Sequence, residues 1–594
     1  MRLVARLWRH LSRRRQRQFE MLVALMVACA LAELLSLGAI VPFLGVMIAP
    51  DKVMSNRLFG SLARAAGISS PADLVLPFTI AFITAALVAG VIRLLFLWAS
   101  TRFAFATGAD ISTDMYRRTL YQPYPTHVAR NSSEVISGIT GKVHDYVTAL
   151  NQVLLLASAL LTLVTVTLAL LLIDPLVAAL ASLGFGAGYG VITWTYRRRL
   201  HQNSLRVAHE QTQVVKALQE GLGAIRDVLL DGAQEAYCAT YSRADRTLQR
   251  ARGSSAFIAG SPRFAMESLG LVLIALLTYG LSRQPGGIAS ALPGLGALAL
   301  GAQRLLPALQ QAYSAWAGIA GHQASLVETA ELLEQPLPAE AHLPAPQPLP
   351  LLRSLRLDAV RFRYVSDGPW VINDLSLSID RGARVGLVGS TGSGKSTLLD
   401  LLMGLLLPTE GEVLVDGQPL RGERIRAWQR TIAHVPQSIY LADASVAENI
   451  AFGVPPGAID RQRVQQVARQ AQIAEFIEGR PERYDTVVGE RGIRLSGGQR
   501  QRIGIARALY KQASVLVFDE ATSALDNVTE QSVMDAIEGL TRRLTIVLIA
   551  HRLTTVRRCD VIFELEHGRV VAHGSYERLL ECSASFRRMA RAVG

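Results

Sequence analysis

Hydrophobic positions are concentrated in the first 325 residues of the chain, where long apolar runs alternate with polar stretches. An apolar run of about 20 residues is long enough to cross the hydrocarbon core of a bilayer as a helix. Six such spans are expected, at roughly 19–49, 75–106, 147–173, 176–196, 256–282 and 288–320. The pattern therefore predicts a membrane α-helical domain of six long transmembrane helices.

The polar stretches near 107–146 and 197–255 are too short to be separate domains. We interpret them as extensions of the membrane helices into the cytoplasm. Residues 1–18 contain seven arginines, which place the N-terminus in the cytoplasm by the positive-inside rule. This segment resembles the start of a signal peptide, but the apolar run from Met21 to Pro50 is longer than a signal peptide requires, which favours a retained membrane helix.

The chain is strongly basic. The chain has 594 residues, a formal net charge of +13 and a pI near 9.8, which by itself is compatible with nucleic-acid binding. Many of the basic residues flank apolar spans, as expected for contact with an anionic membrane surface. We therefore expect a membrane partner and no nucleic acid. The four cysteines have no metal-ligand or disulfide spacing.

A glycine-rich loop follows the apolar run 385–388 and precedes the helical pattern of 398–402. Such a loop brings backbone N–H groups close to phosphate oxygens at the start of a helix. In this interpretation Lys395 reaches the β- and γ-phosphates of ATP, and Ser396 is a ligand of Mg²⁺. The loop consists of Gly389, Ser390, Thr391, Gly392, Ser393, Gly394, Lys395, Ser396 and Thr397. The alternative is a plain glycine turn.

A second apolar strand pattern, 515–518, ends in the carboxylates Asp519 and Glu520. Asp519 is expected to hold Mg²⁺, and Glu520 is expected to orient or deprotonate the attacking water. The sequence Leu-Ser-Gly-Gly-Gln at 495–499 precedes an arginine-rich helical pattern. With this signature, the chain resembles the ABC ATPases.

The resemblance implies roles for further residues. Tyr364 would stack on adenine, Gln437 would be the glutamine that contacts Mg²⁺, and His551 would lie near the γ-phosphate. Taken singly, these residues could also be a strand aromatic, a turn residue and a core histidine. The remaining residues implied in nucleotide contacts are Ser496, Gly497, Gly498 and Gln499 of the signature and Asp526 of the D-loop.

The order of these motifs fits a C-terminal α/β P-loop ATPase domain with a helical subdomain inserted around 440–500. A proline-rich segment precedes it and favours an extended spacer. We therefore expect four regions: a basic cytoplasmic N-terminus at 1–18, the membrane domain at 19–325, a linker at 326–350 and the nucleotide-binding domain at 351–594.

In the ABC family, a signature loop contacts the ATP that a partner's phosphate loop binds. This chain carries one copy of each motif and one set of six spans, so the resemblance implies a homodimer with two composite ATP sites. In the exporter class, short coupling helices connect the membrane domain to the ATPase domain. The segments 123–133 and 220–227 are the candidates, and solvated hairpins are the alternative.

Charged residues inside the spans are the best local clue to the substrate. Arg93, Arg263 and Arg304 lie in or near three apolar runs, and charges at such positions suggest a transport pathway. Arginines from three helices could bind a pyrophosphate. Structural pairing is an equal alternative, because Glu267 lies four residues after Arg263 and Glu33 could neutralise another arginine.

The membrane half also resembles PglK-type flippases of lipid-linked oligosaccharides, in segments around Glu33, 139–143, 261–267 and 298–307. This resemblance implies that the three arginines handle a lipid pyrophosphate. It also implies that a short amphipathic helix near 54–66 contacts a polyprenyl tail, with simple packing on neighbouring spans as the alternative.

The sequence thus predicts an ATP-driven flippase, multi-pass in the cytoplasmic (inner) membrane, for a polyprenyl-pyrophosphate-linked oligosaccharide. An exporter of another lipid, a drug or a peptide is the nearest alternative. An ATP-gated channel and a soluble ABC ATPase of nucleic-acid metabolism are alternatives from other classes, and the six spans argue against the second.

Overall fold

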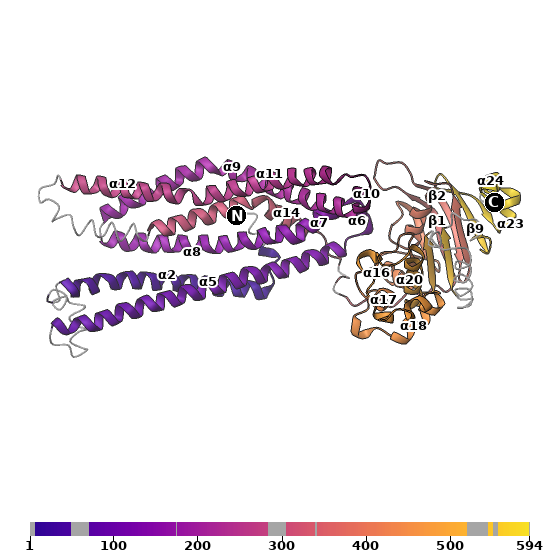
Figure 1. The fold of residues 1–594 in the computed structure, drawn as a ribbon, viewed down its shortest axis with the longest axis horizontal. Coiled ribbons are helices and arrows are strands. Elements are labelled where there is room, and N and C mark those ends of the chain that lie inside the picture. The colour runs from indigo at the N-terminus through magenta and orange to yellow at the C-terminus, as the bar shows by residue number, and fades with distance from the viewer. Residues whose placement is uncertain are drawn as a thin grey trace. The chain divides into compact units, whose positions relative to one another are not determined.

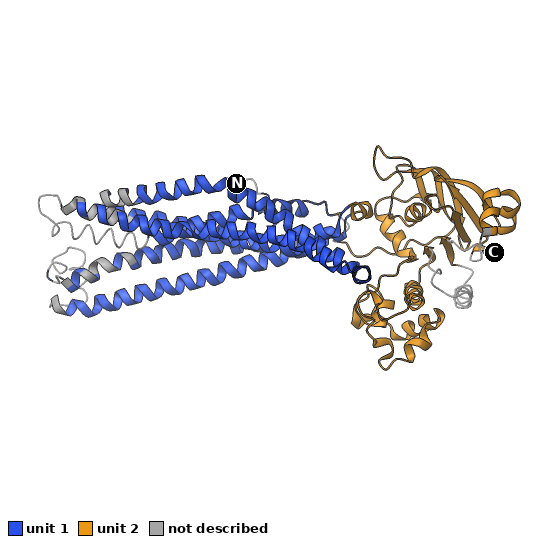
Figure 2. Ribbon diagram, turned by 45° about the horizontal axis from the view of Figure 1, so that its top comes forward, with its two compact units in different colours: residues 1–122, 130–337 blue, residues 123–129, 338–594 orange. Residues whose placement is uncertain are grey.

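The computed structural model describes residues 6, 8–48, 51, 71–173, 175–282, 305–338, 341, 343–519, 544–549 and 556–592. The chain divides into two compact units (Figure 2). Unit 1 consists of residues 1–122 and 130–337 and is helical, whereas unit 2 consists of residues 123–129 and 338–594 and combines β-sheets with helices.

Unit 1 is built from long helices that run alongside one another (Figure 1). Its long helices are α2 (Arg13–Ile48), α5 (Val75–Leu120), α8 (Val143–Ile173), α9 (Pro175–Gly223), α11 (Gln234–Gly260), α12 (Pro262–Ser282) and α14 (Gln323–Leu333). Its shorter elements are a 3₁₀ turn (Pro71–Leu74), α7 (Ser132–Ser137), a π-helical turn (Gly138–Lys142) and α10 (Ile225–Leu230). Residues 305–321 are also helical.

Each of the six predicted spans contains a helix in the part of the chain that the structure describes. Three helical stretches there are long and apolar enough to cross a membrane: Arg13–Ser36, Val75–Leu120 and Ser132–Leu168. Large apolar side chains such as Leu35, Leu87 and Leu168 are exposed along them. Outward-facing apolar side chains are expected of helices that contact lipid.

Two boundaries differ from the sequence prediction. The predicted span 256–282 is interrupted at Ser261, because α12 begins at Pro262, and proline lacks the N–H that a continuous helix would use. Residues 326–333, predicted as linker, belong to α14, where Leu326, Ala330 and Leu333 are buried in the core of unit 1. The predicted external helix near 54–66 lies outside the described residues.

The polar stretches are largely continuous with the membrane helices, as predicted. Helix α5 continues to Leu120, and α9 continues to Gly223. Short helices occur at both candidate coupling segments: α6 (Tyr124–Ala129) in the first and α10 at the end of the second. Their coupling role stays a prediction.

Unit 2 contains two sheets. An antiparallel sheet has the strand order β2-β1-β4-β5, and a six-stranded sheet has the order β10-β9-β3-β8-β7-β6. The strands are β1 (Ser354–Phe362), β2 (Ile372–Asp380), β3 (Arg384–Gly389), β4 (Glu410–Val415), β5 (Gln418–Pro419), β6 (Ile432–Val435), β7 (Val515–Asp519), β8 (Thr545–Ile549), β9 (Val561–Glu566) and β10 (Arg569–Gly574). The helices besides α6 are α15 (Lys395–Leu402), α16 (Glu423–Thr431), α17 (Val446–Ile450), α18 (Arg461–Gln470), α19 (Ala474–Glu478), α20 (Gly497–Tyr510), α23 (Tyr576–Cys582) and α24 (Ala584–Ala592).

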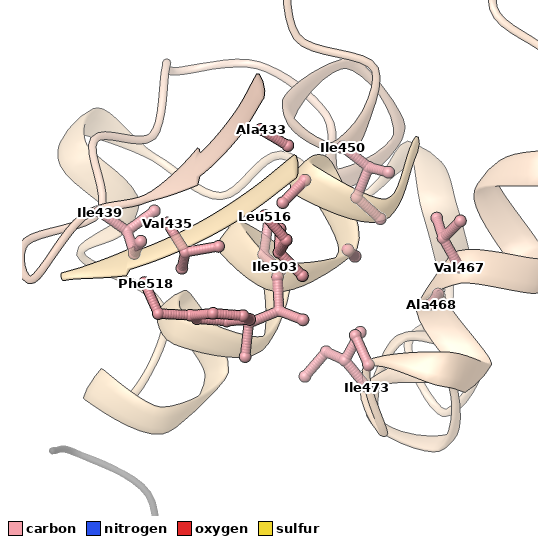
Figure 3. Close-up of a cluster of buried hydrophobic side chains, with 14 of the residues drawn as sticks. Ala433, Val435, Ile439, Ile450, Val467, Ala468, Ile473, Ile503, Leu516 and Phe518 are labelled. Carbon is pink, nitrogen blue, oxygen red and sulfur yellow. The ribbon is translucent and has the colours of Figure 1, made fainter. Parts of the chain in front are cut away.

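The inner strands β3, β8 and β7 of the six-stranded sheet are buried on both faces. Along β7, Val515 and Val517 belong to one apolar cluster, whereas Leu516 and Phe518 belong to the other, because successive side chains of a strand point to opposite faces. Figure 3 shows the second cluster, in which Phe518 lies beside Ile503 of α20. This cluster extends to Ile450, Val467 and Ile473, so the inserted helical subdomain shares its core with the sheet.

Candidate functional site

The glycine-rich loop connects the carboxyl end of β3 to the N-terminus of α15, as the sequence predicts. Strand β3 lies inside the sheet, where it pairs in parallel with β8 and β9. Helix α15 is anchored by Leu398, Leu401 and Leu402, each of which is at least 99% buried. The loop is therefore held at both ends by buried apolar residues, which fixes where its backbone N–H groups point.

Two glycines of the loop are required by its geometry. Gly389 has φ +152° and Gly394 has φ +98°. A Cβ atom on Gly389 would lie 2.2 Å from the backbone oxygen of Leu565, and one on Gly394 would lie 3.0 Å from the side chain of Ile372. The loop therefore forms a tight cradle of backbone that larger residues would disrupt.

Two polar side chains of the loop, those of Lys395 and Ser393, are buried beside its backbone. Lys395 is mostly buried, and its Nζ atom donates to the backbone oxygens of Gly389 and Ser390 at 2.9 Å each. Ser393 is 2% exposed, and its hydroxyl has no hydrogen-bond partner among the described residues. A buried hydroxyl without a hydrogen-bond partner costs free energy, which a ligand that supplies the hydrogen bond would recover.

Tyr364 lies beside the same helix N-terminus. Its hydroxyl is 3.1 Å from the hydroxyl of Thr397, and the tyrosine as a whole is 53% exposed. The ring therefore has an open surface next to the loop, as required of a residue that stacks on adenine.

Asp519 lies at the same edge of the sheet as the loop. It ends β7, and both Asp519 and Leu387 of β3 pair with Ile549 of the strand between them. Their Cα atoms are thus separated by two strand spacings, about 10 Å. The parallel strands bring the predicted metal-binding carboxylate to the start of α15, where Ser396 is exposed.

Asp400 lies near Ser396 and Asp519, and the sequence did not predict it as a residue of this site. It lies four residues after Ser396 on α15, so the two side chains share one face of the helix. Burial raises the pKa of the Asp400 carboxyl to about 6, and the charge of Asp519 adds to the shift. The i,i+4 spacing from Ser396 was the available signal, but nothing in the sequence shows that this face is directed at β7.

Of the remaining predicted residues, Gln437 and the signature lie in the described part of the chain. Gln437 is exposed, just after the carboxyl end of β6, which pairs in parallel with β7. The signature forms the N-terminus of α20: the Ser496 hydroxyl accepts from the backbone N–H of Gln499, whose Oε1 accepts from the backbone N–H of Ser496. This capping box fixes a helix N-terminus that favours an anion. Glu520, Asp526 and His551 lie outside the described residues.

The residues present fit ATP with Mg²⁺. The backbone cradle and Lys395 suit phosphate oxygens, and the unpartnered Ser393 hydroxyl lies within the loop. The Ser396 hydroxyl and the Asp519 carboxylate are oxygen ligands of the kind that Mg²⁺ prefers.

In unit 1, two of the three predicted substrate arginines form ion pairs. Arg93 of α5 donates from Nη2 to Glu33 of α2, and Arg263 of α12 donates from Nε to Glu267 at 2.8 Å. Both ion pairs agree with the structural pairing that the sequence offered as an alternative to substrate binding. Arg304 lies outside the described residues. Whether these arginines contact a substrate stays a prediction.

Arg93 and Glu33 border a cavity of about 420 Å³ between α2, α5, α8 and the helix 305–321. Its lining is partly polar, with Ser158, Thr162 and Gln311 beside the ion pair. The side chain of Arg93 is 46% exposed, whereas that of Glu33 is 11% exposed. The guanidinium is therefore the more accessible partner.

Both the membrane region and the ATPase region of the chain match known proteins. The family model described as the ABC transporter transmembrane region matches residues 37–283, and the model described as ABC transporter matches residues 372–523. A solved structure of a bacterial Atm1-family ABC exporter with ATP bound aligns with a TM-score of 0.77 at 27% identity, covering 95% of this chain and 97% of that one.

Among curated proteins, the ATP-dependent lipid A-core flippase of Alkalilimnicola ehrlichii is 36% identical over 421 residues, which is 69% of each chain. The protein of the same name from Chromobacterium violaceum is 35% identical over 66% of this chain and 68% of its own length. The heterocyst differentiation ATP-binding protein HepA of a Nostoc species is 45% identical over a shorter part, 39% of this chain and 38% of its own. The chain therefore belongs to the ABC transporters, with an exporter-type membrane domain and a P-loop ATPase domain that couples ATP hydrolysis to transport.

Proposed function

We propose that two copies of this chain form an ATP-driven flippase, multi-pass in the inner membrane, that moves a lipid with an anionic, glycan-bearing headgroup to the outer leaflet. Polyprenyl-pyrophosphate-linked oligosaccharide is the specific substrate we propose. The N-terminus and the ATPase domain would lie in the cytoplasm. The arginine-rich first segment supports this orientation.

The cavity beside Arg93 is the observation that carries the substrate proposal. It lies inside the predicted spans and combines a guanidinium with polar and apolar side chains. Charged residues at this depth normally line a pathway, because they are costly in contact with lipid. Such a lining suits an amphiphile whose phosphate meets the guanidinium and whose chain meets Phe96 and Leu155.

A different glycolipid is a second candidate, because the curated relatives named above are called lipid A-core flippases. The Glu33 carboxylate affects how either substrate would bind. It neutralises Arg93, so an anionic headgroup must displace it or share the guanidinium. Either substrate class carries the oxygen atoms that could do so.

In the ATPase domain, we propose that Lys395 and the loop N–H groups bind the phosphates, while Ser396, Gln437 and Asp519 hold Mg²⁺. The metal neutralises charge on the phosphates when bound. Tyr364 would stack on adenine. Glu520 would orient or deprotonate water, His551 would lie at the γ-phosphate, and the signature of one chain, with Asp526, would close the site of the other.

The experiment that tests the substrate class is ATPase activity in lipid nanodiscs. Polyprenyl-pyrophosphate oligosaccharide, lipid A-core and a neutral hydrophobic drug would each be titrated against the same preparation. We expect the polyprenyl-pyrophosphate oligosaccharide to stimulate ATPase activity saturably, and at a lower concentration than the other two compounds. Stimulation by lipid A-core alone would favour the second candidate, and stimulation by the drug alone would contradict both.

A further inference from the structure

A second cavity in unit 1 shares no lining residue with the one beside Arg93. It has a volume of about 340 Å³ and is almost wholly apolar. Its walls are Trp8 and Leu11 of the N-terminal segment, Phe19 of α2, Phe103 of α5, Tyr146, Ala149, Leu150 and Val153 of α8, Trp316, Ile319 and Ala320 of the helix 305–321, and Gln323 and Leu326 of α14.

The cavity lies at the cytoplasmic boundary of the predicted bilayer. Phe19 begins the first predicted span, Phe103 lies near the end of the second, and Trp316 lies near the end of the sixth. All three positions are cytoplasmic ends in the predicted topology. Tryptophan and tyrosine are typical of this depth, where one side of a ring meets hydrocarbon and the other meets polar headgroups.

The N-terminal segment is fixed in place as a wall of this cavity. The Arg6 guanidinium donates to both oxygens of Glu334, at 2.8 and 2.6 Å, and Arg15 donates to Asp110 at 2.7 Å. Between these anchors, the ring of Trp8 packs edge-on against Phe19 with 5.0 Å between centroids. Six elements therefore build the cavity, and the N-terminal segment is one of them.

Three hydrogen-bond donors line the cavity without a partner in the described part of the chain. Tyr146 is 3% exposed, and no hydrogen bond joins its hydroxyl to another described residue. The same holds for the indole N–H groups of Trp8 and Trp316. Tyr146 is buried, whereas Trp8 and Trp316 are partly exposed. Their polar groups can therefore meet a ligand that has an apolar body and acceptor oxygens.

The adjacent surface is cationic. Arg13, Arg14 and Arg17 lie in sequence between the lining residues Leu11 and Phe19, and all three are exposed. None of them forms an ion pair within the described residues. Basic side chains at the cytoplasmic surface of a membrane attract anionic lipids.

We propose that this cavity is a binding site for a resident anionic glycerophospholipid of the cytoplasmic leaflet. One acyl chain fills the apolar cavity, and its size is at the lower end of known ligand cavities, roughly 300–1,000 Å³. The ester carbonyl oxygens accept hydrogen bonds from Tyr146, Trp8 and Trp316. The phosphate lies against Arg13, Arg14 and Arg17. This site does not depend on the identity of the transported substrate.

The test is photochemical labelling of the full-length protein in nanodiscs. Phosphatidylglycerol with a photoreactive acyl chain is compared with phosphatidylcholine that carries the same chain, and labelled residues are mapped by mass spectrometry. We expect phosphatidylglycerol to label the lining residues of α8 and the helix 305–321 at least about fivefold more, the factor that one arginine contributes at a membrane surface.

Two variants locate the site. Ala320→Phe places a ring in the cavity and should abolish the labelling, whereas Ala86→Phe makes the same change on an exposed position of α5 outside the cavity and should not. Replacing Arg13, Arg14 and Arg17 together with Gln leaves the cavity intact and should reduce phosphatidylglycerol labelling to the phosphatidylcholine level. The triple arginine variant tests the proposal even if Ala320→Phe fails to fold.

Several results would overturn the proposal. Equal labelling by the two lipids would show that the site does not select an anionic headgroup. Labelling that survives Ala320→Phe would place the chain elsewhere, and crosslinks from the lining residues to a second copy of the protein would make the cavity a subunit contact. Loss of labelling when unlabelled glycolipid substrate is added would identify the occupant as transported lipid. The proposal expects none of these outcomes.

Discussion

Arg93 of α5 donates a hydrogen bond to Glu33 of α2, which joins the first two helices of the membrane domain. The two residues are 60 positions apart in sequence, and the Glu33 side chain is the more buried partner. An anionic ligand must therefore compete with the Glu33 carboxylate for this guanidinium. The pair therefore has two separable roles to test, in stability and in substrate binding.

Replacing Arg93 with Ala should destabilise the membrane domain. The change leaves the Glu33 carboxylate in a mostly buried position without its partner. We expect a loss of about 2 kcal/mol, less than the 3–5 kcal/mol of a fully buried pair because Arg93 is half-exposed. Thermal unfolding in detergent would measure it. Arg263→Ala, which breaks the more exposed pair on α12, is the matched control and should have a smaller effect.

The double variant Glu33→Gln/Arg93→Met removes both charges and should regain most of the lost stability. If Arg93 binds a headgroup phosphate, this stable variant should still lose stimulation of its ATPase activity by the lipid substrate. Full stimulation would instead make the pair purely structural.

Asp400→Asn should stabilise the ATPase domain in a pH-dependent way. The pKa of Asp400 is raised to about 6 by burial and by Asp519, so the ionised form is disfavoured in the folded protein. Stability is therefore lost as pH rises from the ordinary carboxyl pKa, near 4, through 6, and the cost is fully present at pH 7.5.

We expect the unfolding temperature of Asp400→Asn to exceed that of the unchanged protein at pH 7.5, without nucleotide or divalent cations. The gain should be roughly 2–4 °C, from about 1 kcal/mol after a discount for partial exposure. The difference should shrink at pH 5, where Asp400 is largely protonated. A gain that is equal at both pH values would show that its charge is not the cause.

Mixed dimers should reveal whether the ATP sites are composite. Lys395→Ala removes the phosphate contact, and Ser496→Arg blocks the signature, so each homodimer should lack ATPase activity. A dimer with one variant of each kind keeps one complete composite site and should recover activity. The control pairs an unchanged chain with one that carries both substitutions. Composite sites predict that this dimer is inactive, and activity in it would show that each chain completes its own site.

Glu520→Gln should preserve ATP binding and slow hydrolysis severely, because a neutral amide cannot act as a general base. We expect a loss of at least about 100-fold in turnover, the usual contribution of such a group. Nucleotide binding, followed by fluorescence, should change little. Near-normal turnover would mean that another residue positions the water.

The sequence predicts the parts of the site that local chemistry determines. The loop from Gly389 to Thr397 and the signature at the start of α20 are determined by neighbouring residues. Similarly, the pairing of Arg263 with Glu267 follows from helical spacing.

Other features depend on how distant elements pack. The pairing of Arg93 with Glu33 and the approach of Asp400 to Asp519 each join residues that no local pattern connects. The cavity lined by Trp8, Tyr146 and Trp316 is a further case, because its walls come from six separate elements. Sequence periodicity predicts that such residues lie on one face of a helix but not which element that face meets.

Lipid movement in proteoliposomes that contain the full-length protein tests the glycolipid-flippase function most directly. Fluorescent polyprenyl-pyrophosphate oligosaccharide and fluorescent lipid A-core would be compared, each with ATP and with the Glu520→Gln variant as the control. We predict ATP-dependent movement of the polyprenyl lipid between leaflets that is lost in the variant. Absence of movement for both lipids, in vesicles whose ATPase activity is intact, would contradict the claim that this transporter is a glycolipid flippase.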